Sequence, residues 1–214
     1  MLTQAGLWVC LALGLAVGIV GAYRVKMIQM PQAVALLNGF GGAASALVAA
    51  VSLMEGLTGI FSLVTAGLAL AVGMITLTGS LIAAGKLQKL ISQRPVVWKG
   101  HSAIVGLSIV LTAVTVALAA VPTVPVWLSL VLCLCFSGFF GVAFAIRVGG
   151  ADMPITISLL NSLSGVAGAI AGMAIGDPLL VAIGGVVGAS GLLLTQIMCR
   201  AMNRHLGDIL LGKT

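Results

Sequence analysis

The sequence predicts an all-α protein, a polytopic bundle of about seven transmembrane helices. Of its 214 residues, 61% are hydrophobic and 7% are charged, whereas an average soluble domain carries about 25% charged residues. With a mean hydropathy of +1.27, the chain has too few polar side chains to cover a soluble surface. Seven separate apolar stretches also reach the length of about 20 residues that a helix needs to cross a bilayer. This composition excludes a soluble enzyme, a nucleic-acid-binding protein and a disordered chain.

In chain order the expected spans are residues 4–22, 31–54, 58–84, 101–121, 125–146, 154–175 and 179–200. The first span has no basic segment before it and no small-residue cleavage site after it, so we interpret it as a helix and not as a signal peptide. Pro31 and Pro154 stand at the starts of two helices, where the missing N–H costs nothing. Pro122 and Pro125 mark a short turn between two spans.

The charged residues predict how these spans are oriented. Glu55 and Asp177 fall on one side of the seven-span arrangement. All ten basic residues fall on the other side: Arg24, Lys26, Lys86, Lys89, Arg94, Lys99, Arg147, Arg200, Arg204 and Lys213. The positive-inside rule then places the N-terminus outside and the C-terminus in the cytoplasm or matrix. Topology therefore explains the net charge of +6 better than an anionic partner such as a nucleic acid does.

Sequence signatures of chemistry on a soluble substrate are absent. The segment Gly149–Asp152 resembles a phosphate-binding loop only superficially, because no strand precedes it and no Lys-Ser/Thr pair follows. The four cysteines lie in apolar stretches without disulfide or metal-site spacing, so we expect them to be small buried hydrophobic residues. No catalytic residue, cofactor-binding residue or metal ligand is therefore expected in this chain.

Two stretches of the chain resemble each other. Residues 24–49 and 147–172 align at a constant offset of 123, and ten of the 26 positions are identical. The identities include Arg24/Arg147, Met30-Pro31/Met153-Pro154, Leu36-Leu37-Asn38/Leu159-Leu160-Asn161 and Gly42/Gly165. This pattern predicts a parallel three-helix internal repeat, about 4–84 and 125–200, with helix 101–121 as the connector. The alternative is a chance likeness between two spans rich in glycine and alanine.

A polar seam runs along the inner faces of the predicted spans. Asn38 and Asn161 are amides deep within two of them, Ser158 shares a helix face with Asn161, and Thr76 and Ser80 lie on the face of another helix. Such polar groups must find a partner or water inside a membrane. They can line a wet path, or the two asparagines can simply tie helices together. Because no charged residue or histidine lies mid-membrane, the chain itself supplies no titratable group for a proton relay.

Several motifs resemble a known family, the membrane domain (beta-subunit side) of proton-translocating nicotinamide nucleotide (NAD(P)+) transhydrogenase. They are Met30-Pro31 through Gly42, Thr78-Gly79-Ser80 with Gly85-Lys86-Leu87, Gly149-Gly150-Ala151-Asp152-Met153-Pro154, Leu160-Asn161-Ser162, and Gly188-Ala189-Ser190-Gly191 running into Met198-Cys199-Arg200-Ala201-Met202-Asn203-Arg204. The resemblance covers essentially the whole chain. It implies that the chain serves an enzyme that couples hydride transfer from NADH to NADP+ to inward proton translocation.

The resemblance also implies roles for individual residues. Asn161 matches the asparagine of the proton path, which Asn38, Ser158, Thr76 and Ser80 would extend. Three further residues match positions that couple the membrane to the NADP(H) domain: the acidic Asp152, the tightly packed Gly191 and the hinge arginine Arg204. Some relatives carry a membrane histidine where this chain has Asn38, so a partner would have to supply it. For Asp152 the alternative is a simple helix N-cap, worth about 1 kcal/mol.

The resemblance further implies how the chain is organised. Residues 1–205 would form the transmembrane proton-translocating domain, and 206–214 would begin the linker to an NADP(H)-binding domain that this chain lacks. We interpret the chain as a fragment or a split subunit that alone binds no nucleotide and is inactive. Expected partners are an alpha-type subunit that supplies membrane helices and the NAD(H) domain, the NADP(H)-binding domain, a second copy of the complex and the lipid bilayer. The expected location is the bacterial cytoplasmic (inner) membrane rather than the mitochondrial inner membrane.

Two other functions stay open from the sequence. The chain could be a transporter whose two repeats enclose a small neutral solute between Asn38 and Asn161. It could also be a structural membrane anchor for soluble domains.

Overall fold

The computed structural model describes residues 4–121 and 123–211, and every regular element within them is a helix. The long helices are α1 (Gln4–Arg24), α2 (Met30–Met54), α3 (Ile60–Leu87), α4 (His101–Leu118), α5 (Val126–Ile146), α6 (Met153–Ile175) and α7 (Pro178–Ala201). The short ones are η1 (Met27–Gln29), η2 (Gly150–Asp152) and α8 (Leu206–Leu211). Pro122 and Lys213, expected in a turn and on the basic side, lie outside the described residues.

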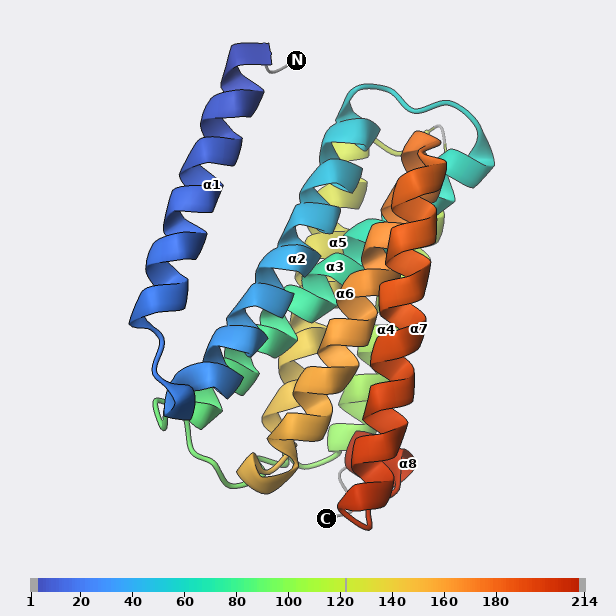
Figure 1. The fold of residues 1–214 in the computed structure, drawn as a ribbon. Coiled ribbons are helices and arrows are strands. Elements are labelled where there is room, and N and C mark those ends of the chain that lie inside the picture. Colours follow the sequence, from blue (N-terminus) through green and yellow to red (C-terminus); the bar gives the residue numbers. More distant parts are fainter. Residues whose placement is uncertain (1–3, 122, 212–214) are drawn as a thin grey trace.

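All seven long helices are long and apolar enough to cross a membrane. The prediction of an all-α, multi-pass membrane protein is therefore confirmed, and the helix ends differ from the expected ones by at most three residues. The helices alternate in direction, so the two ends of the chain lie at opposite ends of the molecule (Figure 1). The connections 25–29, 88–100, 147–152 and 202–205 share one end, which we call the basic end; Glu55 and Asp177 lie in the turns of the opposite end.

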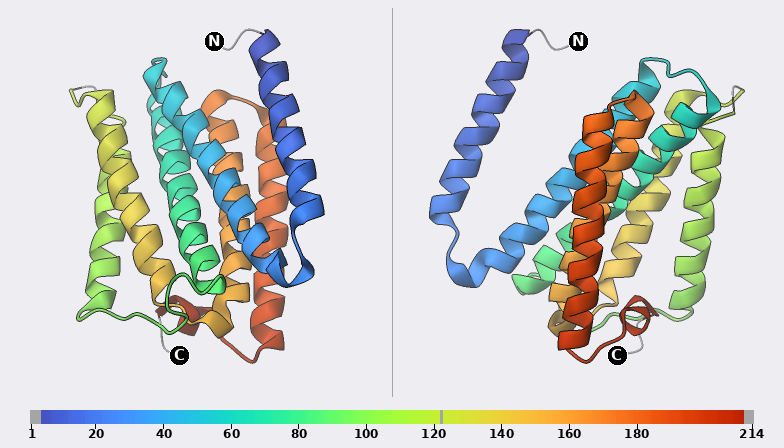
Figure 2. Two further views of the ribbon diagram at one scale, coloured as in Figure 1. Left: turned by 90° about the vertical axis from the view of Figure 1, so that its left-hand side faces the viewer. Right: turned by 45° about the vertical axis from the view of Figure 1, so that its right-hand side comes forward.

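Helices α2 to α7 form the bundle, and α3 is at its centre, packed against α2, α5 and α6. Helix α6 also packs against α7 and α2, while α4 lies on the outside against α5. Helix α1 stands apart from the bundle (Figures 1 and 2), and none of its span is buried. Among the described helices, none packs closely against α1.

Glycines set the closest approaches within two antiparallel helix pairs. A Cβ added to Gly42 of α2 would lie 2.7 Å from the carbonyl oxygen of Gly73 of α3. A Cβ added to Gly165 of α6 would lie 2.5 Å from the backbone nitrogen of Gly188 of α7. No side chain fits at these positions, and the absence of one lets the backbones touch.

The buried apolar residues form two clusters separated along the bundle axis. The cluster nearer the acidic turns contains Ala46, Ala49, Leu53, Ala66, Ala69, Leu70, Ala71, Val116, Leu130, Cys133, Ala171 and Ala174. The cluster nearer the basic end contains Ala35, Ala83, Ala84, Val148, Met153, Ile155, Ile157, Leu160, Cys199 and Ile209. On α2 and α3 the positions between the two clusters carry Asn38, Thr76 and Ser80.

Two helix ends differ from the predicted ones by three residues. Helix α3 continues to Leu87, past the expected end at residue 84, because its last carbonyls are capped by a turn at Lys89, whose φ is 60°. The N–H of Leu90 donates to the carbonyl of Gly85, and the N–H of Lys89 to that of Lys86, which is a Schellman motif. The extra turn places Lys86 inside the helix. Helix α4 ends at Leu118, short of the expected residue 121.

The expectation that all four cysteines are buried is wrong for two of them. Cys133 and Cys199 are buried, but Cys10 and Cys135 are exposed on the outside of the described helices. Cys10 lies on α1, which has no helix packed beside it, and Cys135 lies on the outward face of α5. An apolar residue in a span can face lipid as readily as protein, so hydrophobicity alone does not predict burial there.

Candidate functional site

A layer of polar side chains crosses the bundle between the two apolar clusters. Asn38 of α2 is 8% exposed, and its Nδ2 donates a hydrogen bond of 3.2 Å to the carbonyl oxygen of Ile157 of α6. In an α-helix that carbonyl also accepts from the backbone N–H four residues later, which is the N–H of Asn161. The amide of Asn38 therefore reaches the helical turn that carries Asn161.

The same layer continues between α6 and α7. Thr195 Oγ1 donates to the carbonyl oxygen of Gly191 over 2.8 Å and lies 3.0 Å from Ser158 Oγ, with which it shares a hydrogen bond between helices. Both residues are buried. Ser162 Oγ donates to the carbonyl oxygen of Gly188 over 2.6 Å. Sequence reasoning did not identify Thr195 and Ser162 as site residues. The signal for Thr195 was its position on the glycine-lined face of α7.

On α3, Thr76 and Ser80 are fully buried. Thr76 Oγ1 donates to the carbonyl oxygen of Val72 in its own helix, over 2.7 Å. Ser80 Oγ has no hydrogen-bond partner in the described chain. A buried hydroxyl without a partner is a place where an ordered water bonds well, if space allows.

Asn161 is half-buried, and its side chain makes no hydrogen bond within the described residues. The structure thus brings Asn38 to the turn of Asn161 and Ser158 to Thr195, and it places Thr76 and Ser80 on the helix beside them. An amide can both donate and accept hydrogen bonds. The layer can therefore hold water or orient a neighbouring group, but none of these side chains titrates near neutral pH.

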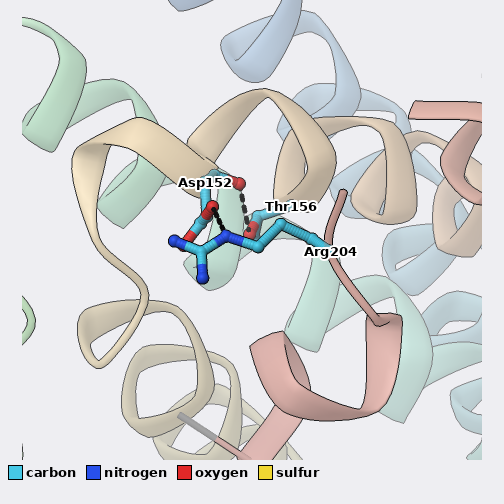
Figure 3. Close-up of polar contacts among 3 residues, drawn as sticks. All are labelled: Asp152, Thr156 and Arg204. Atoms are coloured by element: carbon cyan, nitrogen blue, oxygen red, sulfur yellow. Dashed lines mark hydrogen bonds and ion pairs between the residues drawn. The ribbon is translucent and has the colours of Figure 1, made fainter. Parts of the chain in front are cut away.

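At the basic end, Asp152 and Arg204 form an ion pair of 3.3 Å between Oδ1 and Nε (Figure 3). The Asp152 side chain is 4% exposed and that of Arg204 is 41% exposed. The alternative of a simple N-cap is wrong in one respect: Asp152 precedes α6, but its side chain makes no capping hydrogen bond. Its backbone has ψ near 0° instead of the extended conformation that N-caps usually adopt, and the carboxylate turns toward Arg204 instead.

The end of α7 explains how Arg204 reaches Asp152. Asn203 follows the helix with φ of 51°, a left-handed conformation that asparagine tolerates better than most residues. The N–H of Arg204 donates to the carbonyl of Cys199, and the N–H of Asn203 to that of Arg200. This second Schellman motif reverses the chain and turns it back toward the start of α6.

Lys86 binds the backbone of the segment that leads to Asp152. Its side chain is fully buried, and its Nζ donates to the carbonyl oxygens of Arg94, Ile146 and Val148, the last over 2.8 Å. The sequence predicted that Lys86 follows the third span, but the structure places it inside the last turn of α3 and buries it. One signal could have revealed its burial, because it lies three residues after Ala83 on the small-residue face of α3.

A shallow pocket opens beside the ion pair at the basic end. Its volume is about 430 Å³, and its walls are Gln93, Arg94, Pro95, Gly149, Gly150, Ala151, Asp152 and Arg204. The N–H of Gly150 donates to the carbonyl oxygen of Gln93 over 2.8 Å, so the two connections that form the walls are tied together. The pocket is open at the basic end, and Asp152 and Arg204 form part of its wall.

His101, at the basic-end start of α4, has a structural role. Its Nε2 lies 2.9 Å from the carbonyl oxygen of Ala143, and its Nδ1 accepts from the backbone N–H of Trp98 over 3.3 Å. Both ring nitrogens of His101 therefore have a hydrogen-bond partner. Within the described ranges, no group of three His, Cys, Asp or Glu side chains is arranged to hold a metal ion.

Gly191 of α7 lies against the backbone of α6. A Cβ at this position would lie 2.9 Å from the Cα of Ser162. The structure thus places the three residues assigned to coupling at two sites, with Asp152 and Arg204 paired at the basic end and Gly191 between α6 and α7.

Comparison with known proteins gives a consistent result over the whole chain. A family model described as NAD(P) transhydrogenase beta subunit matches residues 2–214. The NAD(P) transhydrogenase subunit beta of Rhodospirillum rubrum is 41% identical to this chain over 221 residues, and the same protein of strain ATCC 11170 matches equally well. The alignment covers 98% of this chain and 47% of the relative. The chain therefore spans about half the length of the curated relatives it matches.

Proposed function

Because the chain belongs to the NAD(P) transhydrogenase beta subunit family, we propose that it is the membrane part that conducts protons for this enzyme. The reaction it would serve is hydride transfer from NADH to NADP+, coupled to inward proton movement. NAD(H) and NADP(H) would bind to partner domains, and the residues of this chain would provide the membrane path and the link to those domains.

The observation that carries this proposal is the polar layer in an otherwise apolar bundle. Asn38 and Thr195 form hydrogen bonds between helices, Ser80 has a free hydroxyl, and Asn161 has an amide without a side-chain partner in the described chain. Polar residues are costly inside a membrane and mark ion or substrate pathways there. No feature of the described residues specifically favours a structural membrane anchor or a transporter of a neutral solute.

The layer would conduct protons through water and not through its own side chains. Asn161 would hold a water molecule or orient a titratable group of the partner subunit, because its amide donates and accepts without carrying a charge. Asn38, Ser158, Thr76 and Ser80 would extend the path. The proton-accepting group itself would come from an alpha-type subunit that supplies further membrane helices.

Asp152 would couple the proton path to the NADP(H) domain. Asp152 stands immediately before α6 and Asn161 lies nine residues later, or about 13 Å along a helix, so the two residues lie at different depths. The pairing of Asp152 with the half-exposed Arg204 connects α6 to the segment after α7. In this proposal, residues 1–205 are the transmembrane domain, residues 206–214 begin the linker, and Gly191 keeps α6 and α7 in register.

We infer that the two sequence-similar halves are also related in space. Gly41 of α2 faces Ser164 of α6, and Ser45 of α2 faces Gly168 of α6. Each of these pairs joins residues that match at the offset of 123, as expected where a two-fold axis passes between two elements. The relation is incomplete, since α3 packs along α6 but no comparable contact joins α7 to α2 in the described chain.

The orientation we propose follows from the charge distribution. With the basic end in the cytoplasm, the pocket beside Asp152 and Arg204 would face the nucleotide-binding domains. The membrane would be the bacterial cytoplasmic membrane. The unpacked helix α1 would contact the alpha-type subunit or a second copy of the complex.

The test is Asn161→Leu in the complete enzyme, reconstituted into liposomes with a pH-sensitive dye inside. We expect proton-coupled hydride transfer to fall at least about tenfold, or about 1.4 kcal/mol in the barrier. Nucleotide binding to the isolated soluble domains should not change. The readouts are the initial rate of internal pH change and the rate of NADPH formation.

The matched control is Thr112→Val on α4. Thr112 is also buried, but its hydroxyl donates to the carbonyl of Ser108 in its own helix and lies outside the polar layer. Its replacement should have a clearly smaller effect. If Asn161→Leu pumps protons normally, the amide is only a packing residue and the proposed path is wrong.

A further inference from the structure

The chain that follows α7 contacts the bundle at a second point, beyond the ion pair of Arg204. Helix α8 (Leu206–Leu211) lies at the basic end of the bundle (Figures 1 and 2). Its Ile209 is 2% exposed, so this side chain is almost completely removed from water. Leu206 lies three residues earlier on the same face of the helix and packs against the same apolar cluster, the one near the basic end.

Helix α8 is too short to be stable by itself. It has six residues, and an isolated helix shorter than about 12–15 residues is only marginally stable in water. Its first turn closes on the carbonyl oxygen of His205, which accepts from the backbone N–H groups of Asp208 and Ile209. One side of the helix is open, because no atom lies within 4 Å of a Cβ added to Gly207. Packing of the other side, through Leu206 and Ile209, therefore stabilises the helix.

The apolar cluster that buries Ile209 includes the beginning of α6. Met153 and Ile155, in the first turn of α6, are fully buried members of this cluster. Ile157 of the next turn belongs to it as well, and the carbonyl oxygen of Ile157 accepts the hydrogen bond from Asn38. One continuous apolar cluster thus joins α8 to the turn of α6 at which the polar layer crosses that helix.

Residues 202–209, which we call the return segment, are therefore held at three points. The backbone N–H of Arg204 donates to the carbonyl oxygen of Cys199, at the end of α7, over 2.8 Å. The side chain of Arg204 pairs with Asp152, immediately before α6. Ile209 packs in the apolar cluster. The first contact is to α7 and the other two are beside the start of α6, so the return segment connects the ends of two neighbouring helices.

The hinge between this chain and a following domain has two candidate positions. The family resemblance places it at Arg204, in which case α8 moves with the domain. Movement of α8 away from the bundle exposes the side chains of Leu206 and Ile209 to water, which the hydrophobic effect opposes. A hinge after Ile209 leaves these contacts intact. The burial of Ile209 therefore favours the second position.

We propose that the return segment moves together with the start of α6 and that the hinge to the following domain lies after Ile209. Ile209 is then a positioning residue for coupling. A movement of the NADP(H)-binding domain displaces Ile209, changes the packing of Met153 and Ile155, and so shifts the turn of α6 that carries the polar layer. This inference rests on the proposed function, because it assigns Ile209 to the coupling of the same proton path.

The test is Ile209→Ala in the complete enzyme, reconstituted into liposomes. The readouts are the number of protons moved for each NADPH formed, and the rate of hydride transfer with an uncoupler present. We expect the number of protons to fall at least about fivefold, the lower end of usual coupling factors. The uncoupled rate of hydride transfer should not change. Ile209→Val should keep the coupling, because it removes a single carbon atom from the buried side chain.

Two control variants separate coupling from a general loss of structure. Gly207→Ala places a methyl group on the open side of the same helix and should leave the number of protons unchanged. Leu53→Ala opens a similar space in the other apolar cluster, near the acidic turns, where Leu53 is 4% exposed. It should lower the melting temperature of the complex without changing the number of protons for each NADPH.

A double variant tests whether one segment carries both contacts. Arg204→Gln combined with Ile209→Ala should reduce the number of protons no further than the more severe single variant does, because both act through the return segment. Multiplied effects would overturn the proposal, and so would an unchanged number of protons in Ile209→Ala or an equal loss in Leu53→Ala. Failure of the proposed function is a separate result, namely normal pumping by Asn161→Leu.

Discussion

Lys86 is a buried cation whose described partners are all backbone carbonyls. Its ammonium group satisfies carbonyl oxygens at the end of α5 and in the following segment, where no helical N–H is available. The same segment leads directly to Asp152. Lys86 is therefore a positioning residue for the ion pair at the basic end, although among the described residues it makes no hydrogen bond to Asp152 or Arg204.

We predict that Lys86→Met loosens the segment 146–152. The carbonyl oxygen of Val148 loses its donor, whereas that of Ile146 keeps the backbone N–H of Val96. A buried unsatisfied group of this kind costs about 1–3 kcal/mol. Amide hydrogen exchange in this segment should accelerate roughly tenfold or more. The control is Lys99→Met, because Lys99 is an exposed lysine at the same end. Unchanged exchange in Lys86→Met would mean that water replaces the ammonium group without loss.

Sequence reasoning identified Asp152 and Arg204 but not the contacts that position them. Both residues stand in segments that match the family motifs, so their presence was visible in the chain. The left-handed turn at Asn203 depends on local backbone geometry, and the contact of Lys86 with the end of α5 joins residues 60 positions apart. Such contacts leave no periodic pattern in a sequence.

At the scale of helices, α6 and α7 are held together by backbone contact at glycines. Gly191 faces the Cα of Ser162, and Ser162 in turn donates to the carbonyl of Gly188. Gly185 on the same helix α7 has no atom within 4 Å of an added Cβ. Helix α7 thus contains one glycine, Gly191, with no room for a side chain, and another, Gly185, with room for one.

We predict that Gly191→Ala destabilises the chain and that Gly185→Ala does not. A methyl group at residue 191 would force the two helices apart, and overpacking of this kind typically costs about 1–3 kcal/mol. The same methyl group at residue 185 points into open space. Unfolding of each variant in mixed micelles by a denaturing detergent measures the difference. Equal stability of the two variants would show that the α6–α7 interface adjusts without strain.

The helices were predictable because each needs only length and hydrophobicity, and these are local properties. Their ends were predicted less well where a capping motif extended a helix, as at the end of α3. The face that each helix buries was predictable where small and polar residues share it, as on α6. It was not predictable for α1, whose glycines Gly14, Gly18 and Gly21 have no neighbour within the described chain.

At the scale of the whole molecule, the charges sort to the two ends of the bundle. Every described basic residue lies at the basic end, in a connection or in the last turn of a helix, and Glu55 lies in a turn of the opposite end. This separation is what the seven-span arrangement predicted. It is also the property that decides how the chain is inserted.

We predict that Lys89 and Lys213 face the cytoplasm. In a background without native cysteines, Lys89→Cys and Lys213→Cys should react with a membrane-impermeant maleimide only after the cells are opened. Glu55→Cys should react from outside in intact cells. Labelling of Lys89→Cys in intact cells would contradict the seven-span topology.

The contact between Asn38 and Ile157 has a consequence for assembly during synthesis. The pair α2–α3 can close as soon as α3 has been made, because a turn of only a few residues joins the two helices. The carbonyl that accepts from Asn38 is made 119 residues later, or roughly 6–24 seconds at the usual elongation rate of about 5–20 residues per second. During that interval the amide has no acceptor from α6, and it must be shielded by water, by lipid headgroups or by the insertion machinery. Because α6 is synthesised late, the nascent chain is most exposed to quality control while only the α2–α3 pair has formed.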